Sequence, residues 1–244
     1  IEEVLEHLDE TFDAEKSSHV IMLYMENIHN PKKLLKHATS LIGKGCKIAA
    51  IKSGSSAAGS RAASSHTGAL AGSDVAFDTA FKQSGVFRVT TMDELFDLGL
   101  AFSKCPLPTG RTLAIITNAG GGGVLSVDAM ERYGLELVKF DEETNARLKE
   151  AVPEEGSIKN PIDVLGDAPV IRYKESLEAV LDSDDVDGLV VMVCPTASAD
   201  ADGIAQALVE GASEFDKPVI AVNMGGPTFE NANEVLRDNG IPTY

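Results

Sequence analysis

Short runs of aliphatic and β-branched residues alternate with amphipathic stretches along this chain of 244 residues. In the first half, the runs HVIMLYM (19–25), CKIAAIKS (46–53) and VFRV (86–89) are separated by segments with helical periodicity. Parallel strands need a crossover connection, which is usually a helix, so this alternation favours parallel sheets covered by helices. We therefore predict an α/β fold.

The segment CPLPTGR at 105–111 divides the chain, because its prolines and glycine are typical of a linker. It separates a helical segment at 91–103 from a β-branched run at 112–117. The alternation then starts again, with apolar runs at 188–194 and 218–223 and helical segments at 201–215 and 229–238. We predict two flavodoxin-like three-layer α/β/α domains, residues 1–107 and 108–244.

An internal repeat supports this division. The segment from HVIMLYM to IAAIKSG matches the segment from GLVVMVC to VIAVNMG, which aligns Gly54 with Gly225 and Gly85 with Gly240. Gly54 and Gly85 are 31 positions apart in the first copy, whereas Gly225 and Gly240 are 15 apart in the second. The first copy therefore carries 16 additional residues. Loops after the strands hold ligands in doubly wound sheets, so the longer copy is the first place to look for a function.

His66 lies in that longer copy, where small residues meet an alanine-rich helical stretch. Backbone amides at a helix start attract anions, and a neutral imidazole is a nucleophile near neutral pH. We predict that His66 accepts a phosphoryl group, while Ser65, Thr67 and Gly68 bind the phosphate. A solvent-exposed loop histidine is the alternative.

Glu26 directly follows the apolar run 19–25, at the expected carboxyl edge of the first sheet. A carboxylate there can accept the Nδ1 proton of His66 and leave Nε2 to attack phosphorus, so we predict a catalytic role for Glu26. A solvated glutamate in a turn is the alternative.

The segment TNAGGGGV at 117–124 follows a predicted strand and opens a helix. Its amides can hold a second anion, because glycine lets a ligand approach the backbone closely. It lacks the GK[ST] of a Walker A sequence and departs from the dinucleotide fingerprint at Leu125. A tight strand-to-helix turn is the alternative. The predicted phosphate-binding residues are Asn118, Gly120, Gly121, Gly122 and Gly123.

Other polar residues give weaker signals. Lys52 and Arg61 flank the longer loop and can neutralise a phosphate or nucleotide, although ordinary surface charges are the alternative. Asn160 to Asp163 can position the glycine turn or form a common Asn-Pro turn. The sequence has no GxSxG elbow, HExxH helix or His/Cys cluster, which disfavours serine hydrolase and metalloenzyme functions and gives no metal ligands.

Composition excludes further classes. A formal net charge of −17 disfavours nucleic-acid binding, which needs clustered basic residues. No apolar run approaches the roughly 18 residues of a membrane helix. The three cysteines, Cys46, Cys105 and Cys194, are isolated, which fits a reducing compartment, so we expect a cytoplasmic location.

Four separated motifs resemble one family, the ADP-forming acetyl-CoA synthetases of the succinyl-CoA synthetase superfamily. SSHTGALAGSD (64–74) resembles its active-site histidine segment, and the strand and helix at 20–38 resemble the segment whose glutamate stabilises the phosphohistidine, which corresponds to Glu26. IITNAGGGGVLSVDAMERYGL (115–135) and NPIDVLGDA (160–168) resemble the family's second ligase domain. The resemblance spans nearly the whole chain, with the motifs in the family's order.

The resemblance implies part of a reversible ligase that makes acid, CoA and ATP from an acyl-CoA, ADP and phosphate through a phosphohistidine. CoA, ADP or ATP, phosphate and Mg²⁺ are then expected in the complete enzyme, with acyl-CoA or acyl phosphate and nucleotide as substrates. The CoA-binding domain, the ATP-grasp module and the first strand and helix of the first domain are expected outside this chain. The isolated chain is therefore expected not to complete turnover, and the edge of an incomplete first sheet favours oligomer formation.

Two other functions are weighed against the ligase. A non-catalytic module that senses acyl-CoA or nucleotide is one alternative, although the presence of His66 favours catalysis. An NAD(P)-binding oxidoreductase domain that uses residues 118–124 is the weaker alternative, because the dinucleotide fingerprint is imperfect.

Overall fold

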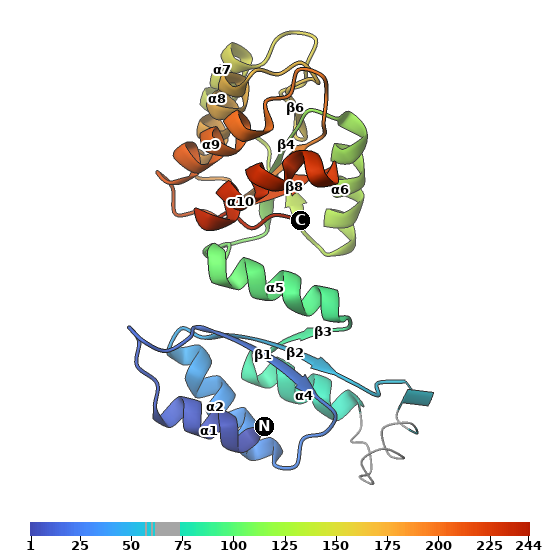
Figure 1. Ribbon diagram of the computed structural model, residues 1–244, viewed down its shortest axis with the longest axis vertical. Coiled ribbons are helices and arrows are strands. Elements are labelled where there is room, and N and C mark those ends of the chain that lie inside the picture. Colours follow the sequence, from blue (N-terminus) through green and yellow to red (C-terminus); the bar gives the residue numbers. More distant parts are fainter. Residues whose placement is uncertain (57, 60, 62–73) are drawn as a thin grey trace. The chain divides into compact units, whose positions relative to one another are not determined.

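The computed structural model describes residues 1–56, 58–59, 61 and 74–244 (Figure 1). The chain divides into two compact units, Ile1–Ser103 (unit 1) and Lys104–Tyr244 (unit 2). Both have the predicted α/β architecture with parallel strands. Each unit is described by itself.

Unit 1 contains a parallel sheet with the strand order β1-β2-β3 among its described residues. The strands are β1 (Val20–Met25), β2 (Lys47–Lys52) and β3 (Phe87–Val89). The helices are α1 (Glu2–Glu10), α2 (Pro31–Gly43), α4 (Asp74–Ser84) and α5 (Met92–Lys104).

Alternating residues of β2 face the two helical layers of unit 1. Ile48 and Ala50 are fully buried in one cluster, which contains residues of α1, α2 and α4. Ala49 and Ile51 belong to a second cluster with Leu95 and other residues of α5. Successive strand residues point to opposite faces, so β2 is buried on both faces of the sheet. This is why its sequence is a continuous apolar run.

Hydrogen bonds and ion pairs of Asp9 connect α1 to α2. The carboxylate of Asp9 accepts hydrogen bonds from Ser40 at 2.6 Å and Lys44 at 2.7 Å, and its Oδ2 lies 2.8 Å from Nδ1 of His37. Burial by itself raises the pKa of Asp9, but the hydrogen bonds from Lys44, Ser40 and His37 outweigh it and lower the pKa to about 2. The contact between these helices is therefore partly ionic.

Unit 2 contains a five-stranded parallel sheet with the path β5-β4-β7-β8, and β6 also pairs with β4. The strands are β4 (Thr112–Thr117), β5 (Glu136–Leu137), β6 (Ile162–Asp163), β7 (Gly188–Val193) and β8 (Val219–Asn223). The helices are α6 (Gly120–Arg132), α7 (Glu142–Ala151), α8 (Val170–Leu181), α9 (Ala201–Ala212), the 3-10 turn η1 (Gly226–Phe229) and α10 (Glu230–Asp238).

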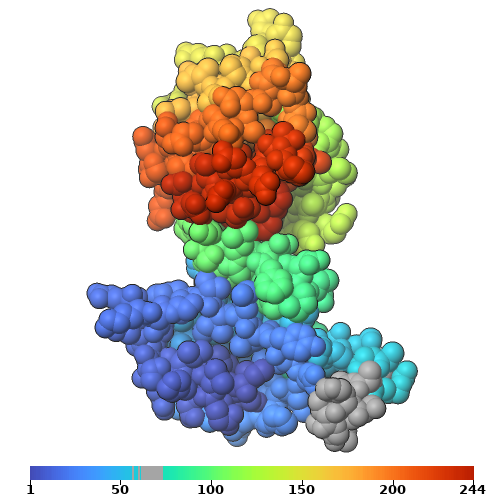
Figure 2. Space-filling model, in the orientation of Figure 1, coloured from blue at the N-terminus to red at the C-terminus, as the bar shows by residue number. Residues whose placement is uncertain are grey.

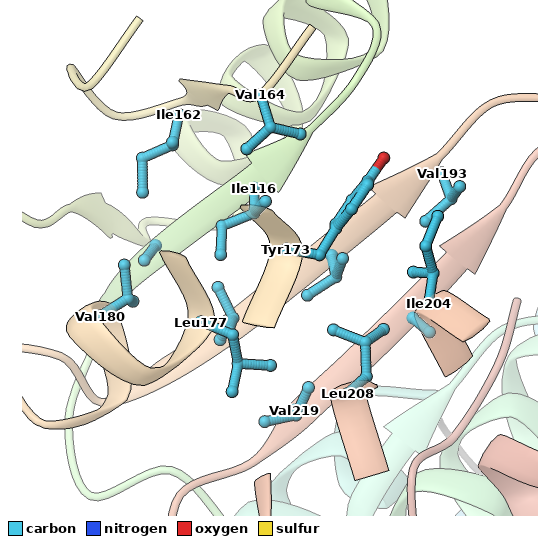
Figure 3. Packing of buried hydrophobic residues seen from close by; sticks show 14 of the residues in the cluster. Ile116, Ile162, Val164, Tyr173, Leu177, Val180, Val193, Ile204, Leu208 and Val219 are labelled. Carbon is cyan, nitrogen blue, oxygen red and sulfur yellow. The ribbon is translucent and has the colours of Figure 1, made fainter. Parts of the chain in front are cut away.

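The larger apolar cluster of unit 2 lies between the sheet and helices α7 to α10. Figure 3 shows the ring of Tyr173 in this cluster, with its hydroxyl pointing away from the packed aliphatic side chains. Burial raises the pKa of this phenol. Helix α6 packs on the opposite face, where Ile115, Met130 and Met192 are buried, and it lies on the surface of unit 2 (Figure 2).

The two copies of the sequence repeat end in the same kind of turn. Gly85 and Gly240 both have left-handed backbones, with φ of +79° and +86°. The next residue donates to a carbonyl five positions earlier in each copy, from Val86 to Phe81 and from Ile241 to Leu236. Only glycine adopts this backbone without steric cost, so both copies need it there.

The strand that follows α6 is shorter than its sequence suggests. The run LELVKF suggests a strand over 135–140, but β5 is only two residues long. The reason is that β4 changes partner along its length: Leu113 pairs with Leu137 of β5, whereas Ile116 pairs with Ile162 of β6. Two short strands thus share one edge of β4.

Candidate functional site

The candidate site in unit 2 lies where β4 ends and α6 begins. β4 ends at Thr117, and Ala119 is the N-cap of α6, with an extended backbone at φ −142°. The amide of Ala119 is held by the Thr117 hydroxyl at 3.0 Å. The strand therefore passes into the helix through only two residues.

The four glycines form the first turn of α6 and not a loop before it. The amides of Gly122 and Gly123 both donate to the carbonyl of Ala119, at 3.0 and 3.3 Å. The amides of Gly120 and Gly121 have no hydrogen-bond acceptor among the described residues. Two backbone donors at the positive end of a helix dipole are thus available to an anion.

The glycines of this turn differ in how much room a side chain would have. A Cβ on Gly123 would lie 3.2 Å from Pro161 and 3.3 Å from the Thr117 methyl, so these neighbours would have to move by a few tenths of an ångström to admit one. A Cβ on Gly121 would meet nothing within 4 Å. Glycine costs a helix interior about 1 kcal/mol relative to alanine. Packing within the described residues therefore does not require glycine at position 121.

The loop that carries Asn160 contacts both β4 and the glycine turn at the start of α6. The Asn160 amide oxygen accepts from the backbone N–H of Ile115 at 3.0 Å, and its nitrogen donates to the carbonyl of Leu113 at 2.8 Å. β5 pairs with the start of β4 and β6 with its end, and the Asn160 side chain provides the hydrogen bonds to the part of β4 between them. The following Pro161 packs against Gly123. This arrangement agrees with the predicted positioning role of residues 160–163.

Asp163 ends the segment 160–163, and no separate role for its side chain follows from the sequence. Its Oδ2 is 3.4 Å from the position of a Cβ on Gly120, so a carboxylate lies beside the start of α6. Its other oxygen accepts from the amide of Leu165 at 2.9 Å, and Leu165 has a left-handed backbone with φ +69°. A non-glycine residue in this conformation is uncommon and often marks a constrained functional loop.

Asn118 uses its side chain to join two strand ends. Its amide oxygen accepts from the backbone N–H of Cys194 at 2.8 Å, and its nitrogen donates to the carbonyl of Cys194 at 2.9 Å. This pair fixes the end of β4 to the end of β7. Both ends of the amide are engaged, so any contribution of Asn118 to phosphate binding comes most simply through its backbone.

The candidate residues of unit 1 lie at the carboxyl edge of its sheet. Glu26 is partly buried and follows Met25, the last residue of β1. Lys52 ends β2 beside Met25 and is only 5% exposed; its Nζ donates to the carbonyl of Gly54 at 2.8 Å and lies 5.2 Å from the centre of the Phe77 ring. Lys52 thus stabilises the start of the longer loop. Arg61 is exposed.

The predicted nucleophile and its neighbours, His66, Ser65, Thr67 and Gly68, lie outside the described residues. Among the residues that are described, no group of three or more His, Cys, Asp and Glu side chains is placed to hold a metal ion. The described helices include none that is long and apolar enough to cross a membrane.

Comparison with known proteins decides the family. Residues 2–102 match the succinyl-CoA ligase like flavodoxin domain, and residues 113–244 match the Ligase-CoA domain. The chain belongs to the Ligase-CoA family, whose model spans more than half of it, and its first part matches the flavodoxin domain of succinyl-CoA ligases. The family and fold class predicted from the motifs are confirmed.

Relatives of this ligase chain come from several archaea. It is 38% identical to the alpha subunit of an ADP-forming acetate–CoA ligase II of Pyrococcus furiosus, over 99% of this chain and 52% of the relative. It is 37% identical to an ADP-forming acetate–CoA ligase I of Archaeoglobus fulgidus, over 93% of this chain and 32% of the relative. The chain thus spans about a third to a half of the curated relatives it matches.

A solved structure covers the whole ligase chain. It is a dinucleotide-forming acetyl-coenzyme A synthetase 1 of Candidatus Korarchaeum cryptofilum, determined with phosphate and ADP, with a TM-score of 0.91 and 35% identity over 100% of this chain and 52% of that one. The names of these relatives support the ligase prediction and neither the sensor nor the NAD(P) oxidoreductase.

Proposed function

We propose that this chain is the phosphoryl-transfer part of a nucleoside-diphosphate-forming acyl-CoA synthetase. The complete enzyme would convert an acyl-CoA such as acetyl-CoA, ADP and phosphate reversibly into the acid, CoA and ATP. The observation that carries the proposal is the first turn of α6, where the amides of Gly120 and Gly121 are open to an anion and no packing contact requires glycine at position 121.

His66 would carry the phosphoryl group between two substrates. Its Nε2 attacks the phosphorus of an acyl phosphate, the bond from phosphorus to the acyl oxygen breaks, and the carboxylate leaves. A terminal oxygen of ADP then attacks the same phosphorus, the N–P bond breaks, and the imidazole is regenerated. Glu26 would accept a hydrogen bond from Nδ1–H, which fixes the tautomer and stabilises the positive charge that the ring gains.

Helix amides would bind the transferred phosphate. In unit 1 we assign the donors to Ser65, Thr67 and Gly68, and in unit 2 to the turn from Asn118 through Gly123. Such donors do not reorganise as charge develops, so they stabilise a transition state without many basic side chains. This suits a chain with 38 acidic and 21 basic residues.

The remaining substrates would bind to other parts of the enzyme. We assign CoA to a CoA-binding domain and nucleotide with Mg²⁺ to an ATP-grasp module, as the resemblance to the family implies. These parts would be joined to this chain or supplied by a partner subunit. We further propose domains at 1–107 and 108–244, a cytoplasmic location and an oligomeric enzyme.

Phosphorylation of His66 tests the proposal. The chain is mixed with the CoA-binding and ATP-grasp parts of a relative, Mg²⁺ and ATP labelled in its γ-phosphate. One labelled histidine per chain is expected, with the acid-labile, base-stable character of a phosphoramidate. His66→Ala should abolish the label, whereas His29→Ala, which changes an exposed histidine close to Glu26 in sequence, should keep it.

Mutation of Glu26 separates its role from that of the nucleophile. Glu26→Gln should still be labelled but more slowly, because the amide holds the tautomer less well and does not offset the charge. Label that persists in His66→Ala, or that is absent from the wild-type chain while the added parts are active with their own partner, would refute the phosphocarrier role.

A further inference from the structure

Three sulfur atoms gather beside the start of α6. They belong to Met192 and Cys194 at the end of β7 and to Met224 directly after β8, and we call these residues the sulfur cluster. Met192 and Cys194 are two positions apart and so point to the same face of the sheet. Val193 pairs with Asn223 in the parallel register, which brings Cys194 next to Met224.

The contacts within the cluster are short. Sγ of Cys194 lies 3.6 Å from Sδ of Met224. The Sδ atoms of Met192 and Met224 lie 3.8 and 3.7 Å from one point, the position that a Cβ on Gly122 would take. The sulfurs of Met192 and Met224 thus flank the backbone at Gly122, where a side chain is absent, and the sulfur of Cys194 reaches this group through its contact with Met224.

The surrounding structure holds two of these residues in place. The backbone N–H and C=O of Cys194 are both bound by the side chain of Asn118, at 2.8 and 2.9 Å. The hydroxyl of Ser126 donates to Sδ of Met192 at 3.1 Å. Met192 is 6% exposed, whereas Met224 is 46% exposed and Cys194 is half-buried, so a small ion reaches the cluster from solvent.

One thiol and two thioethers form a soft donor set. Thiolate and thioether sulfurs select Cu(I) over hard cations such as Mg²⁺, which take oxygen ligands. With metal–sulfur bonds of about 2.3 Å, two sulfurs on one ion lie at most about 4.6 Å apart. The separation of 3.6 Å between Cys194 and Met224 fits this limit without movement of either strand.

We propose that Met192, Cys194 and Met224 bind one soft monovalent cation, Cu(I) or its analogue Ag(I). Binding replaces the thiol proton of Cys194, so that R–SH and Cu⁺ give R–S–Cu and H⁺ without any change in oxidation state. The two thioethers complete a three-sulfur site. The inference uses unit 2 alone and does not depend on phosphoryl transfer at His66.

Titration of the whole reduced chain tests the site. Ag(I) is followed by native mass spectrometry, and Cu(I) by competition with a chromophoric chelator without oxygen. One tightly bound ion per chain is expected. Cys194→Ser should weaken binding more than about 100-fold and Met224→Leu at least about tenfold, since even second-shell changes at metal sites cost 10- to 100-fold.

Two matched controls should leave binding unchanged. Cys105→Ser removes another partly buried thiol that is in no disulfide. Met22→Leu removes a thioether with the same exposed fraction, 46%, as Met224. The inference is overturned if Cys194→Ser binds Ag(I) as tightly as wild type, or if Met224→Leu and Met192→Leu both bind within twofold of wild type.

The methionine methyl groups give a second readout. With ¹³C-labelled methionine methyls, one equivalent of Ag(I) should shift the two resonances that Met192→Leu and Met224→Leu remove, and leave the Met22 resonance in place. Circular dichroism checks that each variant is folded. An ion bound without a shift of either methionine resonance would mean that Cys194 binds it through other ligands, which contradicts the proposal.

Discussion

The two units brace their elements with different kinds of side chain. In unit 1 the contact between α1 and α2 depends on an ionised carboxylate, Asp9, with Ser40, Lys44 and His37 around it. In unit 2 the strand that leads to the glycine turn is braced by two neutral amides, Asn118 and Asn160.

The difference matters for how each unit responds to acid. An ion pair loses its charge when the carboxylate is protonated, whereas an amide keeps its hydrogen bonds at any ordinary pH. The turn that would bind phosphate is thus held by groups that do not titrate, and the α1–α2 contact by groups that do. Three predictions probe this contrast, from the largest effect to the smallest.

Removal of the Asn160 side chain should have the largest effect. Asn160→Ala leaves the amide of Ile115, a fully buried residue, without its partner, and an unsatisfied buried donor costs up to about 3 kcal/mol. Urea unfolding should show this loss at pH 7 and at pH 4 alike. Amide hydrogen exchange at Ile115 and Ile116 should rise in the same variant.

Asn160→Asp serves as the control. The aspartate keeps an acceptor for Ile115 but loses the donor to Leu113, so its stability should lie between that of wild type and the alanine variant. An alanine variant as stable as wild type would show that β4 does not need this bridge.

Acid should weaken the α1–α2 contact over a defined pH range. The pKa of Asp9 is about 2 in the folded chain and 3.8 as an ordinary value, so its stabilisation is present above pH 3.8 and is lost as pH falls toward 2. A shift of this size corresponds to about 2 kcal/mol, since each pKa unit is 1.36 kcal/mol. Urea unfolding at pH 7 and at pH 2 measures it.

Asp9→Asn tests the assignment to this carboxylate. The variant should be less stable than wild type at pH 7, and this difference in stability should narrow by pH 2, where about half of the wild-type carboxylate is protonated in the folded chain. A gap of the same size at both pH values would place the effect in packing and not in charge.

The smallest effects should come from two glycines of the same helical turn. Gly121→Ala should raise stability by up to about 1 kcal/mol, because its Cβ meets open space. Gly123→Ala should lower it by about 1 kcal/mol, because Pro161 and Thr117 must shift. If Gly121 admits a phosphate, its alanine variant should also phosphorylate His66 more slowly, despite its greater stability.

Thermal unfolding measures the stability of Gly121→Ala and Gly123→Ala, and a labelling time course measures how fast each variant phosphorylates His66. Slower labelling of Gly121→Ala, although it is more stable than wild type, would show that the added Cβ hinders the phosphate and does not act through folding. Labelling at the wild-type rate in Gly121→Ala would mean that the phosphate does not approach the backbone there.

Much of the fold follows from local sequence. The apolar runs place β1, β2, β4, β7 and β8, and the matched glycines at 85 and 240 mark turns that only glycine forms readily. Helix α7 escaped the sequence analysis because only Thr144 and Leu148 of its residues are buried, which leaves almost no apolar periodicity. β6 has two residues, too few to form a pattern.

The candidate site was harder to predict in detail. A glycine turn after a strand indicates an anion site, and the structure places that turn at a helix start. The role of Asn118 depends on Cys194, 76 positions away, which no local pattern encodes. The sulfur cluster likewise forms only when β7 and β8 lie side by side. Long-range pairing, and not residue type, decides these contacts.

The paired left-handed turns at Gly85 and Gly240 explain how two copies of one motif can differ in length. Each turn closes its strand-helix-strand piece through contacts within a few residues, so the chain ahead of it is free to vary in length. Chain entropy makes such variation cheap: doubling a flexible segment costs about 0.6 kcal/mol. The longer spacing of the first copy, 31 positions against 15, therefore carries little thermodynamic penalty, and its additional residues include His66.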